Sequence, residues 1–326
     1  MRTVYITKDE STVLKGFFAL LVLMHHVYQQ VLIGEDIAFL DYFFRSLGYI
    51  VVSGFFFFSG YGLTLSNQRS KGEYLRGFLR NRFIPLYLVN VFLIVLYTIA
   101  NIAFTGGGQN LDLKLIAQSF FFGDTIIPAG WYLQELLLFY LIYWLSWKLF
   151  PYKYTDIVVL IILIFQVIAI MADMPSHWYL SCAGFSLGVL YASNKAFIDR
   201  IIISEYHYRT IVTFLSIIVV TAYVSCYLLD LRFLIYTPLK IYVIAPFIPM
   251  VLALLSSRIE LKSRLLYKVG TYALEVYVLQ GLVFILLRNN YWNVSAIIFI
   301  LLSIPLIVIV SYLFHPIFSK VMNMCK

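Results

Sequence analysis

The chain has 326 residues, of which 62% are apolar or aromatic and only 12% are charged, with a net charge of +8. A soluble domain carries about 25% charged residues, so this composition excludes an ordinary water-soluble enzyme, a disordered chain and a nucleic-acid-binding protein. The apolar residues form runs close to the ~20 residues that a helix needs to cross a bilayer.

These runs predict an all-α fold, a polytopic membrane helix bundle with about ten transmembrane helices. In chain order, the expected helices cover residues 14–33, 43–65, 84–104, 130–150, 155–173, 177–193, 209–229, 235–255, 270–288 and 294–318. The eighth helix carries Pro238, Pro246 and Pro249, which predicts a kink or a break because proline cannot donate a backbone hydrogen bond. The longest connection, 105–129, is expected to contain a short helix near 113–122.

The positions of the basic residues predict the orientation of the bundle. If the N-terminus is cytoplasmic, 19 of the 24 Lys and Arg residues lie on the cytoplasmic side and 5 on the other. Because Lys and Arg gather on the cytoplasmic side of short loops, both termini are expected in the cytoplasm, which an even helix count requires. The first apolar run lacks a small-residue cleavage site and is expected to be retained. We therefore expect a multi-pass protein of the cytoplasmic membrane, with one domain over residues 1–326.

The three cysteines are Cys182, Cys226 and Cys325. Their number is odd and they share no CxxC spacing, which argues against a disulfide framework and against a zinc site. We expect buried or idle thiols and no bound metal.

Ionisable side chains inside a bilayer are costly, so they are the first candidates for chemistry. Lys15 and His26 are eleven residues apart, about three helical turns, and therefore lie on one face of the first expected helix. His26 lies about 16 Å along the helix from Lys15, near the bilayer midplane, where an imidazole can exchange a proton or act as a nucleophile. The alternative is a structural histidine bonded to a neighbouring helix. The adjacent His25 points about 100° away and cannot share the role of His26.

The second candidate is the basic segment 66–83, which carries five Lys and Arg residues against one Glu73. Arg76 and Arg80 are four residues apart and are expected on one helical face. Together with Arg82 they suit phosphate oxygens, because a guanidinium group donates hydrogen bonds in a fork. The alternative is that the segment only sets the membrane topology or contacts lipid headgroups.

The third candidate is Glu135, near the start of the fourth expected helix. It is an acid within an apolar run and has no basic residue within a helical turn. Such a carboxylate can orient or deprotonate a hydroxyl acceptor. The alternative is an ion pair with Arg45 or another cation.

Small residues in the second expected helix, Ser59-Gly60-Tyr61-Gly62, are typical of close helix packing. Ser59 can also hydrogen-bond a ligand. Ser59, Tyr61 and Trp131 are the candidate substrate-binding residues.

Taken in order, these segments resemble the motifs of the membrane acyltransferase-3 family. That family opens with an Arg-Gly pair and a His eleven residues after the arginine, and Lys15-Gly16…His26 has this spacing. Its later motifs are similar to Phe55-Phe56-Phe57-Phe58-Ser59-Gly60-Tyr61, to Arg80-Asn81-Arg82-Phe83-Ile84-Pro85, and to Trp131-Tyr132-Leu133-Gln134-Glu135 with Tyr140. The resemblance covers residues 15–140. Two positions depart from it: the family arginine is Lys15, which keeps the charge without the bidentate fork, and a frequent further arginine is Leu79.

The resemblance implies an integral membrane O-acyltransferase. Such an enzyme moves an acyl group, most often acetyl in this family, from cytoplasmic acyl-CoA to a hydroxyl of an extracytoplasmic sugar or polysaccharide. The implied catalytic residues are His26, Glu135 and Lys15, and the implied CoA-phosphate ligands are Arg76, Arg80 and Arg82. His26 either takes the acyl group transiently or acts as a general base, and Glu135 positions the acceptor hydroxyl. The implied partners are the glycan acceptor and membrane lipids.

The rival function is a transporter or flippase for a sugar, a polyol or an acyl group. It would also use polar residues at the midplane and a proline-broken helix, but no inverted repeat is visible in the sequence. A purely structural scaffold would explain the helices but not the ordered motifs.

Overall fold

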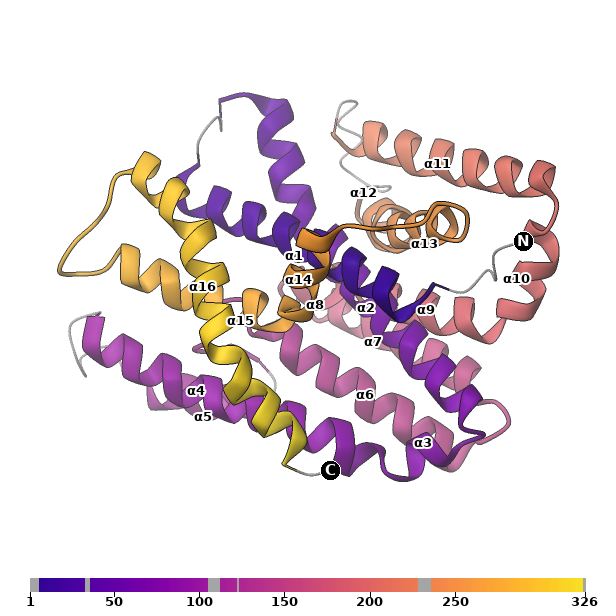
Figure 1. Ribbon diagram of the computed structural model, residues 1–326, viewed down its shortest axis with the longest axis horizontal. Coiled ribbons are helices and arrows are strands. Elements are labelled where there is room, and N and C mark those ends of the chain that lie inside the picture. The colour runs from indigo at the N-terminus through magenta and orange to yellow at the C-terminus, as the bar shows by residue number, and fades with distance from the viewer. Residues whose placement is uncertain (1–5, 33–35, 105–111, 122, 228–235, 325–326) are drawn as a thin grey trace.

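The computed structural model describes residues 6–32, 36–104, 112–121, 123–227 and 236–324 (Figure 1). Within these ranges every regular element is a helix and no strand is formed. The α-helices and the two π-helical segments, η1 and η3, are α1 (Lys8–Val31), α2 (Ala38–Arg69), α3 (Glu73–Arg76), η1 (Leu79–Phe83), α4 (Ile84–Phe104), α5 (Leu113–Ser119), α6 (Trp131–Leu149), α7 (Tyr154–Met171), α8 (His177–Leu180), α9 (Ala183–Ser193), α10 (Lys195–Ile202), α11 (Glu205–Tyr227), α12 (Tyr236–Leu239), η3 (Lys240–Ile244), α13 (Ala245–Ser256), α14 (Arg264–Thr271), α15 (Ala273–Leu287) and α16 (Ala296–Asn323).

Among the described residues, 7 helical stretches are long and apolar enough to cross a membrane, or up to 8 if the bent pair α14 and α15 counts as one span. The all-helical fold is therefore confirmed, whereas the predicted count of ten spans is not. The expected helix 130–150 forms as α6 but is not one of the 7, and the expected helix 177–193 is divided into the short helices α8 and α9. The cytoplasmic location of the termini and the single domain stay predictions.

The proline-rich eighth segment forms one uninterrupted helical stretch, residues 236–256, so the predicted break is absent. Its backbone is nevertheless irregular: the short helix α12 leads into the π-helical segment η3, and α13 then begins with Pro246 in its first turn and Pro249 in its interior. The short helix expected near 113–122 is present as α5, while the three glycines at 106–108 lie outside the described residues.

The basic segment is not one continuous α-helix. Helix α3 ends at Arg76, Gly77 is its C-cap, and the π-helical segment η1 then runs from Leu79 to Phe83. The C-cap residue and the start of the π-helical segment thus separate Arg76 from Arg80. The uninterrupted 3.6-residue period that the prediction of a shared face assumed is therefore not present, and the shared face itself stays a prediction.

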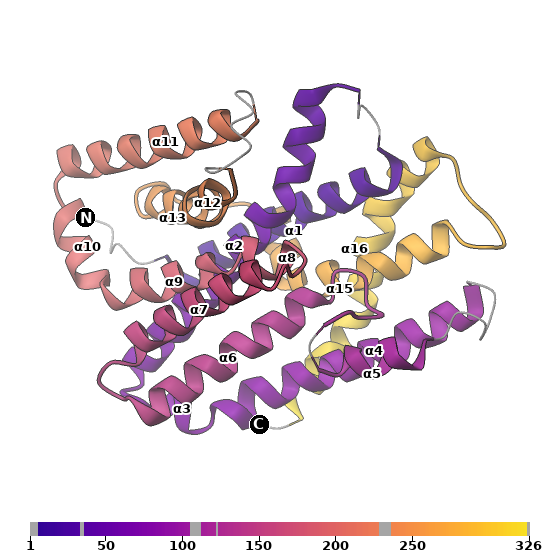
Figure 2. The ribbon, with the colours of Figure 1, turned by 180° about the vertical axis from the view of Figure 1, so that it is seen from behind.

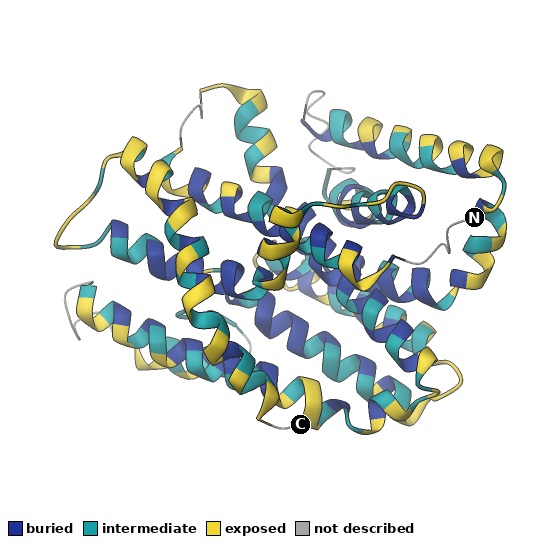
Figure 3. Cartoon of the chain, in the orientation of Figure 1, coloured by how far each residue is buried: buried dark blue, intermediate teal, exposed yellow. Residues whose placement is uncertain are grey.

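Helix α2 is the centre of the bundle. Its apolar window is 78% buried, against 17% for the corresponding window of α11 and 22% for that of α16. Figure 3 shows the same contrast between the dark core helices and the partly yellow outer ones. Glycines let α9 approach α2: a Cβ atom on Gly188 would lie 2.1 Å from the Phe57 carbonyl oxygen, and one on Gly60 would lie 2.5 Å from that of Phe185. The packing role predicted for this part of α2 is confirmed at Gly60, whereas a Cβ atom on Gly62 would meet nothing within 4 Å.

Two further glycines bring α14 against α1. A Cβ atom on Gly16 would lie 1.9 Å from the Leu266 carbonyl oxygen, and one on Gly270 would lie 1.9 Å from that of Thr12. No side chain fits between backbones at this separation. Because the chain bends by 72° between α14 and α15, this contact also places α15 beside α1, which is visible from both sides of the molecule (Figures 1 and 2).

Helix α15 is held from a second direction by α4. The buried Tyr97 hydroxyl donates to the Val278 carbonyl oxygen at 2.7 Å and accepts from the Leu282 N–H at 2.9 Å. Both hydrogen-bonding capacities of this phenol are therefore used on the α15 backbone. The two contacts fix α15 against α1 and α4, and this determines where Tyr277 lies.

The thiols of Cys182 and Cys226 are free and buried, as predicted. Cys325 lies outside the described residues.

Candidate active site

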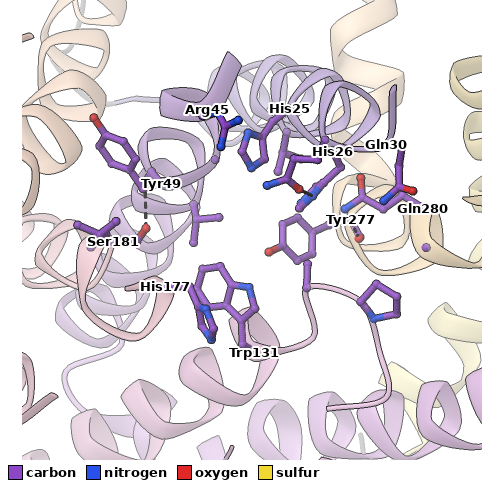
Figure 4. Close-up of a pocket in the computed structure, with 18 of the residues that line it drawn as sticks. His25, His26, Gln30, Arg45, Tyr49, Trp131, His177, Ser181, Tyr277 and Gln280 are labelled. Atoms are coloured by element: carbon purple, nitrogen blue, oxygen red, sulfur yellow. Dashed lines mark hydrogen bonds between the residues drawn. The ribbon is translucent and has the colours of Figure 1, made fainter. Parts of the chain in front are cut away.

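A cavity of about 440 Å³ lies where the C-terminal half of α1 meets α2, α6, α8 and α15. We call it the His26 cavity (Figure 4). Its polar and aromatic lining residues include His25, His26, Gln29, Gln30, Arg45, Tyr49, Trp131, Ser176, His177, Ser181, Tyr277 and Gln280. A concave site with several convergent polar groups is the usual form of a ligand-binding site.

The imidazole of His26 is oriented by its own helix. Its Nδ1 lies 3.0 Å from Oε1 of Gln29, an arrangement that suits the neutral tautomer with the proton on Nδ1, because an amide oxygen can only accept. In that tautomer Nε2 keeps its lone pair and is the atom available as base or nucleophile. The ring stands edge-on to Tyr277, with 6.3 Å between the ring centroids.

The neighbouring His25 is bonded to and packed against helix α2. Its Nδ1 donates to the Phe44 carbonyl oxygen on α2 at 2.7 Å, and a Cβ atom on Gly48 would lie 2.5 Å from its Nε2. The alternative considered for His26, a bond to a neighbouring helix, is thus found at His25. Both histidines line the same cavity, with ring centroids 4.9 Å apart, but their surroundings differ as the helical geometry predicts.

A second cavity, of about 230 Å³, contains the other end of the predicted Lys15–His26 face. We call it the Lys15 cavity. Its polar lining residues are Lys15, Ser59, Arg82, Tyr132, Tyr140 and Tyr277, and none of its described lining residues is acidic. Two basic side chains without a carboxylate favour an anionic ligand, whose charge would pair with theirs.

The three predicted phosphate-binding arginines do not lie together. Arg82 lines the Lys15 cavity and also an adjoining cavity of about 260 Å³, where His315 Nδ1 lies 2.7 Å from Oε1 of Glu275. Arg76 is exposed and forms an ion pair with Glu73 at 2.8 Å. Arg80 is exposed and lines none of these three cavities.

Glu135 is completely buried and lines neither the His26 cavity nor the Lys15 cavity. Its Oε1 accepts from the Cys182 thiol at 2.7 Å, and its Oε2 has no partner among the described residues. The alternative of an ion pair with Arg45 is wrong, because Arg45 pairs with Asp41 at 2.5 Å. A role for Glu135 in positioning the acceptor stays a prediction.

The three candidate substrate-binding residues are divided between the two cavities and the core. Trp131 lines the His26 cavity and packs on His177, with 5.0 Å between the ring centroids. Ser59 lines the Lys15 cavity. Tyr61 instead packs against Phe57 and Tyr191 and lines neither cavity.

Sequence reasoning missed Tyr277, together with His177 and Gln280. Tyr277 is 1% exposed, and its hydroxyl has no hydrogen-bond partner among the described residues, a state that costs about 1–3 kcal/mol for a buried polar group. A signal was available: Tyr277 and Gln280 are three residues apart in an apolar helix and therefore lie on one face. Only the folded structure places that face against α1.

The fold and the two cavities define the chain as a helical multi-pass membrane protein with polar sites inside the bundle. A family model described as an acyltransferase domain matches residues 9–315. The chain therefore belongs to the acyltransferase-3 family, and it is an acyltransferase. Searches of curated proteins and of solved structures found no match to the chain.

Proposed function

We propose that this protein is an O-acyltransferase of the cytoplasmic membrane that moves an acyl group, acetyl in the first instance, from cytoplasmic acyl-CoA to a hydroxyl of an extracytoplasmic sugar or polysaccharide. One observation carries the proposal. Lys15 and His26, on one face of α1, open into two different cavities that meet at a single aromatic ring, Tyr277. Acyl-CoA is too charged to cross a bilayer core, so the protein needs only to pass the acyl group from one cavity to the other.

The Lys15 cavity is the donor site in this proposal. With the N-terminus in the cytoplasm, as the charge bias predicts, this cavity faces the acyl-CoA pool. Arg82 binds the CoA phosphates and Lys15 lies deeper, where its ammonium group stabilises the departing thiolate. Arg76 and Arg80 contribute to attraction of the anionic donor from outside the cavity.

Nε2 of His26 attacks the carbonyl carbon of the thioester. A C–N bond forms, the C–S bond breaks, and its electron pair leaves with sulfur as the CoA thiolate. The acceptor hydroxyl then attacks the acyl-imidazole, the C–N bond breaks, and the hydroxyl proton ends on Nε2. Loss of that proton balances the proton taken up by the thiolate, so that the products are the ester and CoA.

The His26 cavity is the acceptor site. Trp131 and His177 offer an aromatic surface on which an apolar sugar face can pack, and Gln29, Gln30 and Gln280 offer hydrogen bonds to hydroxyl groups. Glu135 is assigned no step, because it lines neither cavity.

Labelled acetyl-CoA separates the proposed function from transport. Membranes that contain the protein are incubated with acetyl-CoA labelled in the acetyl group, and the label is followed into polysaccharide and onto the protein. Transfer to a glycan, with a protein-bound label that is absent from His26→Ala, supports the acyl-histidine route. Transfer without any protein-bound label in a single turnover supports a general base instead. If the label remains in acetyl-CoA while a sugar or polyol crosses the membrane, the result supports a transporter.

Replacing Arg82 with alanine is expected to raise the KM for acyl-CoA about 10- to 100-fold with a smaller change in kcat, because one charge-assisted phosphate contact is lost. The measurement is the rate of acyl transfer against acyl-CoA concentration. Arg209→Ala is the matched control, since Arg209 is an exposed arginine paired with Glu205 on α11. An equal rise in KM for Arg76→Ala would show that the whole basic segment binds the donor, rather than the cavity.

A further inference from the structure

Tyr277 occupies the boundary between the donor and acceptor cavities. Of the described residues, it alone lines both the Lys15 cavity and the His26 cavity. Its ring lies 4.8 Å from the ring of Tyr132 and stands edge-on to Phe55 at 6.2 Å, as measured between centroids. These three rings form an aromatic layer, and a group that moves between the two cavities at this point has to pass the Tyr277 ring.

The hydroxyl of Tyr277 is buried and has no hydrogen-bond partner among the described residues, whereas the Tyr97 hydroxyl on α4 is bonded to the backbone of α15. Figure 4 shows the Tyr277 ring next to His26. A buried donor without a partner, beside the candidate nucleophile, is available to a ligand.

We propose that Tyr277 is the gate and the size filter of acyl passage, and that its hydroxyl hydrogen-bonds the acyl carbonyl oxygen during transfer to His26. This inference rests on the proposed function. The closed ring separates the thioester from water on the acceptor side, and rotation of the side chain admits a short acyl group.

The hydroxyl acts without losing its proton. When Nε2 of His26 attacks the carbonyl carbon, negative charge develops on the carbonyl oxygen, and the Tyr277 O–H donates to it. The electron pair of the breaking C–S bond leaves with sulfur, as in the transfer step above. The same tyrosine thus has two separable parts, a ring that closes the passage and a hydroxyl that stabilises the developing charge.

Two substitutions separate these parts in the full-length purified protein. Tyr277→Ala removes the ring, and Tyr277→Phe keeps the ring and removes the hydroxyl. Three quantities are measured for each: release of free CoA from acetyl-CoA without an acceptor, release from hexanoyl-CoA, and transfer of acetyl label to polysaccharide in membranes. Leu279→Ala is the matched control, because Leu279 is fully buried in α15 and lines neither cavity.

Tyr277→Ala is expected to raise acceptor-free CoA release about tenfold or more and to extend it to hexanoyl-CoA, since water and a longer chain can now enter. Tyr277→Phe is expected to release CoA no faster than the wild type and to transfer label about 100-fold more slowly, because the step that the hydroxyl assists is also the step that frees CoA. Leu279→Ala is expected to release CoA at the wild-type level.

Wild-type CoA release by Tyr277→Ala, or equal CoA release by Leu279→Ala and Tyr277→Ala, would overturn the gate. Unchanged transfer in Tyr277→Phe would overturn the role of the hydroxyl. If Tyr277→Ala is not recovered folded, Tyr277→Leu replaces it and the Tyr277→Phe comparison still decides the role of the hydroxyl. If the wild type transfers label and the Tyr277 variants behave as the wild type does, only this inference is refuted. If the wild type transfers no label, the proposed function is refuted as well.

Discussion

Replacing His26 with alanine is expected to abolish acyl transfer while the amount of protein in the membrane stays normal. The side chain lines a cavity and its Nδ1 hydrogen-bonds Gln29 of the same helix, so its removal costs little packing between helices. Loss of the nucleophile or base is expected to lower the transfer rate by on the order of 1,000-fold or more. The measurement is transfer of acetyl label to polysaccharide, normalised to the protein detected in the same membranes.

Two other histidines serve as comparisons. His207 is exposed on α11, and His207→Ala is expected to transfer label as the wild type does. His25→Ala is expected to lower the amount of folded protein, because His25 bonds the Phe44 carbonyl oxygen and contacts Gly48. Full activity in His26→Ala would remove the relay from the proposed function, whatever the two comparisons give.

The second large effect is expected at Gly16, which follows Lys15 in the first motif. A Cβ atom there overlaps the Leu266 carbonyl oxygen at 1.9 Å, and backbone cannot move aside as a flexible side chain can. Gly16→Ala is therefore expected to push α14 from α1 and to destabilise the fold by about 1–3 kcal/mol or more, as other overpacked sites do. Thermal unfolding of the purified protein in detergent measures this loss.

Gly62 provides the matched control for Gly16. It is also a helical glycine of a predicted motif, but a Cβ atom on it would meet nothing within 4 Å. Gly62→Ala is expected to leave stability unchanged or to raise it by about 0.5–1 kcal/mol, because alanine favours helix over glycine. If Gly16→Ala unfolds at the same temperature as Gly62→Ala, the close contact between α1 and α14 does not contribute to stability in the way described.

The expected effect of Gly16→Ala extends to activity. Helix α15 follows α14 after the 72° bend, so a displaced α14 shifts Tyr277 relative to His26. Transfer per folded molecule is expected to fall together with stability, and Gly270→Ala is expected to do the same from the opposite backbone. Because both substitutions disturb one contact, their effects on the free energy of unfolding are expected to be less than additive.

The family and the all-helical fold could be predicted from the sequence, because both depend on local information. Long apolar runs produce helices wherever they lie, and the spacing of Lys15 and His26 fixes their common face through the helical period. The irregular backbone of the eighth segment could be predicted for the same reason, since proline acts on its own backbone, although the helix there is not broken. These predictions did not depend on which helices pack against each other.

The positions of Glu135 and of the arginines could not be predicted in the same way. Glu135 is three helical residues from Tyr132, yet it faces Cys182 rather than a cavity. Arg76 and Arg80 are close in sequence, but a cap and a π-helical turn place only Arg82 on the Lys15 cavity. A short polar segment does not specify which way its side chains face until neighbouring helices exclude the other directions.

By itself, the sequence determined that the chain forms apolar helices, that Lys15 and His26 share one face of the first, and that the motifs are those of a membrane acyltransferase. Only the tertiary structure decided that the two residues open into different cavities and that Tyr277 stands between them. The physical reason is that Tyr277 is about 250 residues from His26 in the chain, and their contact depends on the backbone approach of Gly16 and Gly270 and on the bend that follows it.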